Sequence, residues 1–200
     1  MADPRQEAVL AYFHRSRELL ERVEKDRAFV AAIVKIADRI AGALSANGKV
    51  LIAGNGGSAA DAQHIAAEFV GRFIGNRKAL AAVALTTDTS ALTAIGNDFG
   101  FEQIFARQIE ALGRKGDIFI AISTSGHSKN VLAALKEARK RGLVNIGFTR
   151  AAKTPMHKYC DLVLAVPSDE TALIQQIHIT AAHAVCHLVE RKLFGRTRRS

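Results

Sequence analysis

The 200-residue chain contains no tryptophan, two cysteines and three prolines. Two thiols, Cys160 and Cys186, are too few for a disulfide framework, which favours a reducing cytoplasm. The longest apolar runs, such as residues 79–85, are far shorter than the roughly 20 residues that a membrane span needs. The first residues also lack the apolar stretch of a secretory signal. We therefore expect a cytoplasmic protein with no membrane partner.

Aromatic residues make up only 6% of the chain, so few rings are available for stacking on nucleic-acid bases. The net charge of +9 would otherwise suggest a nucleic-acid partner. Five basic residues lie within the last ten positions, however, and without them the charge falls to +4. We interpret residues 195–200 as a solvated basic tail and expect no nucleic-acid partner.

The amino-terminal 47 residues have apolar side chains at helical spacing throughout, as in Phe29, Ile33, Ile36 and Ile40. Asn47 and the glycine after it end this pattern. The sequence therefore predicts a helical extension over residues 1–47, which must pack on the rest of the chain or on another subunit.

Beyond residue 48, short apolar runs alternate with helical patterns, which is typical of a parallel sheet covered on both faces. The expected strands are 50–53, 81–85, 118–122, 144–148 and 162–166. The expected helices are 58–73, 90–112, 128–141, a short piece near 155–159, and 168–193. This pattern predicts a single α/β domain over residues 1–200, with a five-stranded, doubly wound, flavodoxin-like sandwich over 48–194.

A glycine-rich loop, Gly54-Asn55-Gly56-Gly57-Ser58, joins the first expected strand to a helix. Such a loop brings backbone N–H groups close to an anion. Its spacing also fits a relaxed dinucleotide fingerprint, which would indicate an NAD-dependent oxidoreductase. Against this alternative, the acidic residue that would bind the ribose is missing at the expected distance, because Asp88 lies too far along the chain.

A second loop, Ser123-Thr124-Ser125-Gly126-His127-Ser128, follows the third expected strand and opens a helix. Its four hydroxyl groups exceed the single one that a helix cap needs. Hydroxyls and N–H groups at a helix N-terminus bind phosphate, so the two loops together favour a small phosphorylated ligand. Polar residues at 86–88 and at 97–98 suit either a polyol or helix capping.

Acid–base candidates lie on two expected helices. His64 and Glu68 are four residues apart and share a face of the helix that starts at the glycine loop. The last helix carries Gln175, and its three histidines are His178, His183 and His187. Gln175 and His183 can line one cleft, while His183 and His187 form a rival metal pair.

The motif running from Gly54 to His64, with Glu68 beyond it, closely resembles the bacterial phosphoheptose isomerases. Further similar stretches are residues 84–88, 94–98, 123–126 and 174–175, so the resemblance spans about residues 8–194. It implies the sugar-isomerase (SIS) fold, a cytoplasmic homotetramer, and a role in making the activated heptose of lipopolysaccharide.

The resemblance also implies site residues. Substrate contacts fall at Asn55, Gly56, Gly57, Glu68, Asn97, Asp98, Ser123, Thr124, Ser125, Ser128 and Gln175. One zinc ion per subunit is expected, held by His64, Glu68, Gln175 and His183. The expected reaction converts D-sedoheptulose 7-phosphate to D-glycero-D-manno-heptose 7-phosphate through an enediol. Glu68 is the expected base and His183 the acid, or the two roles are reversed.

Two alternatives to this activity stay open at the level of sequence. Non-catalytic SIS-type adaptors that bind the bacterial replication initiator resemble this chain in fold but lack the glutamate and the histidine found here at Glu68 and His183. An isomerase of another phosphosugar would share the same loops. Presence of both acid–base residues favours an enzyme.

Overall fold

Five parallel strands form a single sheet in the computed structural model, which describes residues 3–195. Their order is β2-β1-β3-β4-β5, which confirms the doubly wound, flavodoxin-like prediction. The strands are β1 (Val50–Gly54), β2 (Ala82–Ala84), β3 (Ile118–Ile122), β4 (Val144–Arg150) and β5 (Leu162–Val166). The helices are α1 (Pro4–Lys25), α2 (Arg27–Ser45), α3 (Gly57–Val70), α4 (Thr89–Phe99), α5 (Ala106–Leu112), α6 (Lys129–Lys140) and α7 (Thr171–Phe194), with 3₁₀ turns η1 (Phe101–Gln103) and η2 (Pro155–Lys158).

Helices cover both faces of the sheet, and alternate residues of each strand enter different cores. Ile118, Ile120 and Ile122 of β3 pack with α2, α3 and α7. The intervening Phe119 and Ala121 pack with α5 and α6 on the opposite face. Because both faces are apolar, the central strands read as continuous hydrophobic runs, which is why the sequence located them well.

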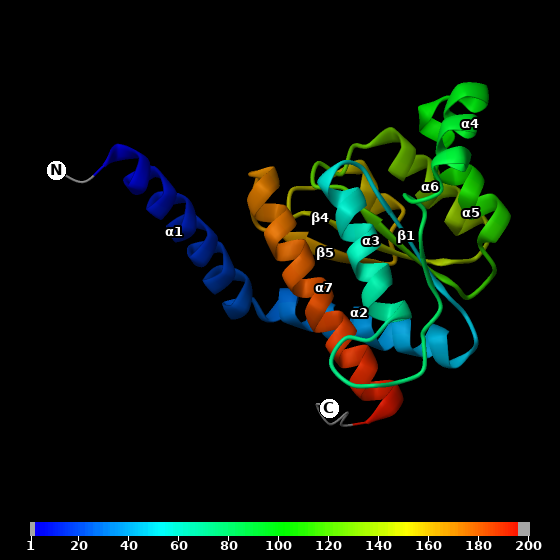
Figure 1. The fold of residues 1–200 in the computed structure, drawn as a ribbon, viewed down its shortest axis with the longest axis horizontal. Helices are drawn as coiled ribbons and strands as arrows, with labels where there is room; N and C mark the ends of the chain where they lie inside the picture. Colours follow the sequence, from blue (N-terminus) through cyan, green and yellow to red (C-terminus); the bar gives the residue numbers. More distant parts are fainter. Residues whose placement is uncertain (1–2, 196–200) are drawn as a thin grey trace.

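The amino-terminal helices serve two different roles. Helix α2 lies against the sheet beside α7, with Ile36 and Ile40 fully buried, so it belongs to the sandwich. Helix α1 alone projects from the body of the molecule (Figure 1), and only its carboxyl-terminal end contributes buried side chains. Asp26 separates the two helices and caps α2 by accepting hydrogen bonds from the Ala28 and Phe29 N–H groups.

Several boundaries differ from the sequence-based expectation. The helix expected over 90–112 is broken into α4, η1 and α5, because Gly100 adopts a φ of +85° that ends α4. Strand β2 is shorter than predicted, and α7 begins three residues later than predicted. Of the expected basic tail, only Gly195 is described, and residues 196–200 lie outside the described part of the chain.

Helix α7 is long and apolar enough, by length and composition alone, to cross a membrane. Half of its apolar window is buried inside the protein, however, and a core helix passes the same test. The helix is therefore weak evidence for a membrane span.

Phe119 is fully buried on the α5–α6 side of the sheet, so Phe119→Ala should lower the free energy of unfolding by about 3–5 kcal/mol. Val83→Ala, on edge strand β2 with a side chain that is 40% exposed, should cost less than about 1 kcal/mol. Denaturant unfolding measures both. Equal losses for the two variants would contradict the assignment of the core.

Candidate active site

The glycine loop joins β1 to α3 in a conformation that only glycine fits. Gly56 has a φ of +55° and caps α3, and a Cβ on Gly54 would lie 2.7 Å from the Ser58 carbonyl oxygen. A Cβ on Gly57 would lie 2.6 Å from Nε2 of Gln175, which places this α7 side chain directly against the loop. No described side chain caps α3, although the Ser58 and Ala59 N–H groups donate to the Asn55 and Gly56 carbonyls within the loop.

The serine loop follows β3 and opens α6. The Ser123 and Ser128 hydroxyls lie 3.0 Å apart, and the Gly126 N–H donates to Ser123 Oγ at 3.1 Å. Gly126 has a φ of +68°, which shapes the turn. Ser125 is exposed at the tip. Ser128, the N-cap residue of α6, makes no side-chain cap bond, and in the first turn Asn130 Oδ1 accepts the Val131 N–H. The dipole of this second helix N-terminus also favours an anion.

The two loops are joined by an amide pair that sequence reasoning missed. Asn55 Nδ2 donates to Asn130 Oδ1, and Asn130 Nδ2 donates back to Asn55 Oδ1, each at 2.8 Å. Asn130 lies on α6 and is 2% exposed. The pairing of Gly54 with Ile122 in neighbouring parallel strands brings the loops to this distance, at the topological switch point of the sheet.

The acid–base candidates meet within one chain. His64 Nε2 lies 3.1 Å from Glu68 Oε1 on α3, and His183 Nε2 of α7 lies 3.4 Å from His64 Nε2. One ligand atom from each of these three residues falls within 4.8 Å of the others. The Phe73 ring packs on His183, with centroids 5.5 Å apart.

This cluster fits a zinc ion. Two imidazole nitrogens and one carboxylate oxygen lie within 4.8 Å of one another, and three protein ligands with an open position are typical of catalytic zinc. Gln175 precedes His183 on α7 by eight residues, which is a helical rise of about 12 Å. Its side chain packs against Gly57 of the glycine loop, so α7 contributes one residue to the loop and another to the cluster. The place of Gln175 as a fourth ligand stays a prediction.

Asp61 is a further polar residue that the sequence reading left without a role. Its Oδ2 is buried and has no hydrogen-bond partner among the described residues. Burial raises the pKa of this carboxyl group above its ordinary value, and nearby His64 opposes the rise. Asp61 lies on α3 about one turn before His64. The sequence motif includes this residue but gives no sign that its carboxyl group is buried.

Other predicted residues lie apart from the cluster or serve the fold. Asn97 and Asp98 are exposed on α4, where Asn97 Nδ2 donates to Asp98 Oδ1, and the described contacts do not connect them to either loop. Asp88 caps α4 through the Ala91 N–H, as the capping alternative predicted. His187 packs near the Phe73 ring and is not part of the metal cluster, so the described structure does not form the rival pair with His183.

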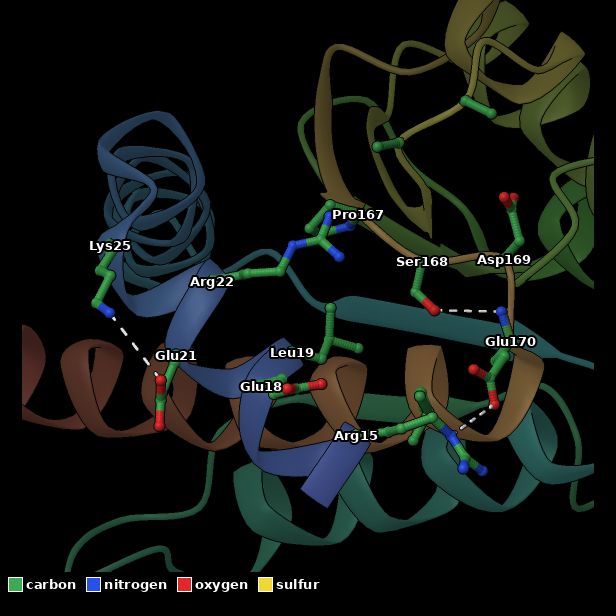
Figure 2. A pocket seen from close by; sticks show the side chains of 13 residues that line it. Arg15, Glu18, Leu19, Glu21, Arg22, Lys25, Pro167, Ser168, Asp169 and Glu170 are labelled. Carbon is green, nitrogen blue, oxygen red and sulfur yellow. Dashed lines mark hydrogen bonds and ion pairs between the residues drawn. The ribbon is translucent and has the colours of Figure 1, made fainter. Parts of the chain in front are cut away.

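A groove of about 830 Å³ lies elsewhere, between α1 and the loop that joins β5 to α7 (Figure 2). Its charged side chains pair with one another, as Arg15 does with Glu170 at 3.7 Å and Lys25 with Glu21 at 4.0 Å. The groove contains none of the loop or cluster residues described above. The candidate site is therefore the pair of loops together with the cluster.

The class of protein follows from a family model described as the SIS domain, which matches residues 11–150. A phosphoheptose isomerase from Bradyrhizobium sp. (strain ORS 278) is 55% identical over 96% of this chain and 98% of its own length. One from Roseiflexus sp. (strain RS-1) is 59% identical over 81% of this chain and 82% of its own length.

Comparison with solved structures points to the same family. A phosphoheptose isomerase from Neisseria gonorrhoeae has a TM-score of 0.87 and 46% identity, covering 92% of this chain and 98% of its own. One from Francisella tularensis has a TM-score of 0.90 and 35% identity, covering 96% and 100%. The chain belongs to the phosphoheptose isomerase family of SIS-domain proteins. It is an enzyme, a sugar-phosphate isomerase, which sets aside the adaptor and NAD alternatives.

His178 is the core histidine of α7, fully buried beneath the Thr149 carbonyl. Burial lowers the pKa of His178 to about 4, because a low-dielectric surrounding disfavours the imidazolium. The unfolded chain, with an ordinary pKa of about 6.5, therefore takes up this proton first as the pH falls. The contribution is fully present above pH 6.5 and is lost progressively down to about pH 4, by about 3 kcal/mol. His178→Phe should flatten the pH dependence of stability over this window, and an unchanged slope would contradict the assignment.

Gly57→Ala should displace the flexible Gln175 side chain without disturbing the backbone. Losing one hydrogen bond of about 1 kcal/mol should raise KM for the sugar phosphate about fivefold. Gly42→Ala in α2 is the control, since a Cβ there meets nothing within 4 Å. Steady-state kinetics with thermal unfolding distinguishes the two, and equal KM values would remove Gln175 from the substrate site.

Proposed function

We propose that this enzyme converts D-sedoheptulose 7-phosphate to D-glycero-D-manno-heptose 7-phosphate through an enediol. The observation that carries the proposal is that α3 begins at the glycine-rich loop and carries His64 and Glu68 farther along, where His183 joins them. In this proposal an acyclic seven-carbon sugar extends across both parts, with its phosphate at the loops and its first two carbons at the cluster.

The loops bind the phosphate through neutral donors. Backbone N–H groups at the starts of α3 and α6 and the hydroxyls of Ser125 and Ser128 surround it, helped by the two helix dipoles. This end of the substrate does not react, so its binding energy serves to orient the sugar.

In this proposal Glu68 accepts the proton from C1 of the ketose and returns it to C2 of the enediol. His183 moves the second proton from the C1 hydroxyl to the C2 oxygen, which becomes the new hydroxyl. The products balance the substrate, since two protons change position and none is gained or lost. The opposite assignment of base and acid uses the same geometry.

His64, Glu68 and His183 would hold the zinc ion, one per subunit, with Gln175 as the proposed fourth ligand, which would leave the second Glu68 oxygen and His183 Nδ1 for proton transfer while zinc is bound. When bound, zinc supplies Lewis-acid polarisation of the substrate oxygens. The remaining work of binding, orientation and proton transfer belongs to the side chains.

We also propose a cytoplasmic homotetramer that supplies heptose for lipopolysaccharide. Val9, Leu10 and Phe13 are exposed on the projecting part of α1, with Phe13 66% exposed, and apolar side chains of this kind favour burial between subunits. Light scattering should report a tetramer, whereas a monomer would contradict the proposed assembly.

The direct test incubates the purified protein with sedoheptulose 7-phosphate and couples the product to a heptose 7-phosphate kinase. The proposal predicts turnover of this ketose and little turnover of fructose 6-phosphate. Preference for the six-carbon sugar would instead support an isomerase of another phosphosugar.

Glu68→Gln should lower kcat by about 10²–10⁴-fold, because the amide keeps the shape but cannot accept a proton from carbon. Exposed Glu110→Gln on α5 is the control and should leave kcat unchanged. The coupled assay measures both. Near-normal kcat in Glu68→Gln would remove this residue from proton transfer.

Ser125→Ala and Ser128→Ala should each raise KM about 5–30-fold with a smaller change in kcat, since a non-reacting phosphate is held alike in the ground and transition states. Ser16→Ala on α1, whose hydroxyl bonds only to its own helix at Tyr12, is the matched control. An unchanged KM in both loop variants would place the phosphate elsewhere.

A further inference from the structure

Arg77 donates hydrogen bonds to several backbone carbonyl groups at the end of α3. Its Nη2 donates to the Glu68 carbonyl oxygen at 2.6 Å, and its Nη1 donates to that of Phe69 at 2.8 Å. Nη1 also reaches the carbonyls of Gly71 and Lys78. The Arg77 side chain is only 2% exposed. The last carbonyls of a helix lack partners within the helix, so a buried cation here prevents fraying of the turn that carries Glu68.

Glu190 on α7 binds the backbone of the loop that follows α3. Its carboxylate accepts N–H bonds from Phe73, Ile74 and Gly75 at 2.9–3.1 Å, and it accepts Arg77 Nε at 2.9 Å. The Glu190 side chain is 1% exposed. Burial disfavours its charge, but these N–H groups and the guanidinium prevail and hold its pKa below the ordinary value.

The pair therefore connects α3 and α7, the two helices that carry the acid–base cluster, with the loop that follows α3. Arg77 is bonded to the backbone of Glu68 itself, and Glu190 lies two helical turns after His183 on α7. Between them, the loop held by Glu190 carries Phe73, whose ring packs on His183. Both helices that carry Glu68 and His183 are thus bonded to one buried ion pair.

We propose that Arg77 and Glu190 are positioning residues, which hold Glu68 and His183 at the separation that zinc binding and proton transfer need. The inference rests on the proposed function of that cluster. It assigns no contact with substrate to either residue. Outer partners of metal ligands commonly change metal affinity by 10–100-fold, so the same range is expected here.

The test compares two buried carboxylates that have similar partners. Asp117 accepts the Lys49 and Arg114 N–H groups and pairs with the Lys49 ammonium, and its side chain is 4% exposed. It directly precedes the central strand β3, at the amino-terminal end of the strands, whereas the loops follow their carboxyl ends. Asp117→Asn and Glu190→Gln therefore remove equivalent charges, one far from the cluster and one beside it.

Zinc affinity is measured by chelator competition, together with kcat and KM for sedoheptulose 7-phosphate, on variants whose folding is checked by circular dichroism. Glu190→Gln should lose 10–100-fold in zinc affinity and in kcat, with KM within about twofold. Asp117→Asn should lose thermal stability but keep zinc affinity and kcat. If Glu190→Gln does not fold, Arg77→Lys, which keeps the charge but loses the planar fork, should show the same losses.

Equal zinc affinity and kcat in the two carboxylate variants would overturn the positioning role and leave the pair purely structural. Failure of the proposed metal centre would look different, because the unmodified enzyme would then bind zinc no better than His64→Ala. In that event the ratio of kcat values between Glu190→Gln and Asp117→Asn decides the inference, and a ratio of one overturns it.

Discussion

The parallel pairing of β1 with β3 is the constraint on which the site depends. Gly54 and Ile122 are register partners at the ends of these strands, so the loops that follow them emerge side by side. The reciprocal Asn55–Asn130 amide bonds then fix that distance. Two helix N-termini lie close together as a result, and their dipoles favour a phosphate there.

Helices α3 and α7 carry the proposed acid–base residues at a distance from the loops. Each has one end at the glycine loop, through Gly57 and Gln175, and each presents a cluster residue farther along, through His64 and His183. Their apolar faces pack in the same core, which leaves the polar residues where the two helices face each other. One packed interface thus positions both the glycine loop and the acid–base candidates.

Local signals predicted much of this arrangement. Continuous apolar runs located the buried strands, glycine and serine clusters located the loops, and the four-residue spacing of His64 and Glu68 predicted their contact. Long-range polar pairs left no such signal, because Arg77 and Glu190 are 113 residues apart and each resembles an ordinary surface charge in the sequence. The break after α4 was also missed. The helical spacing of apolar residues continues past Gly100 in the sequence, whereas the positive φ of Gly100 ends the helix there.

The central claim is that the loops and the cluster of one chain act on one molecule of sugar phosphate. Anomalous diffraction at the zinc edge, from crystals of the Glu68→Gln variant and of the unmodified enzyme soaked with zinc and sedoheptulose 7-phosphate, tests it most directly. The account predicts a zinc peak among His64, Glu68 and His183 in the unmodified enzyme, weakened in the variant, with the phosphate on the Ser125 loop of the same chain. Zinc on other residues, or phosphate in the groove beside α1, would contradict it.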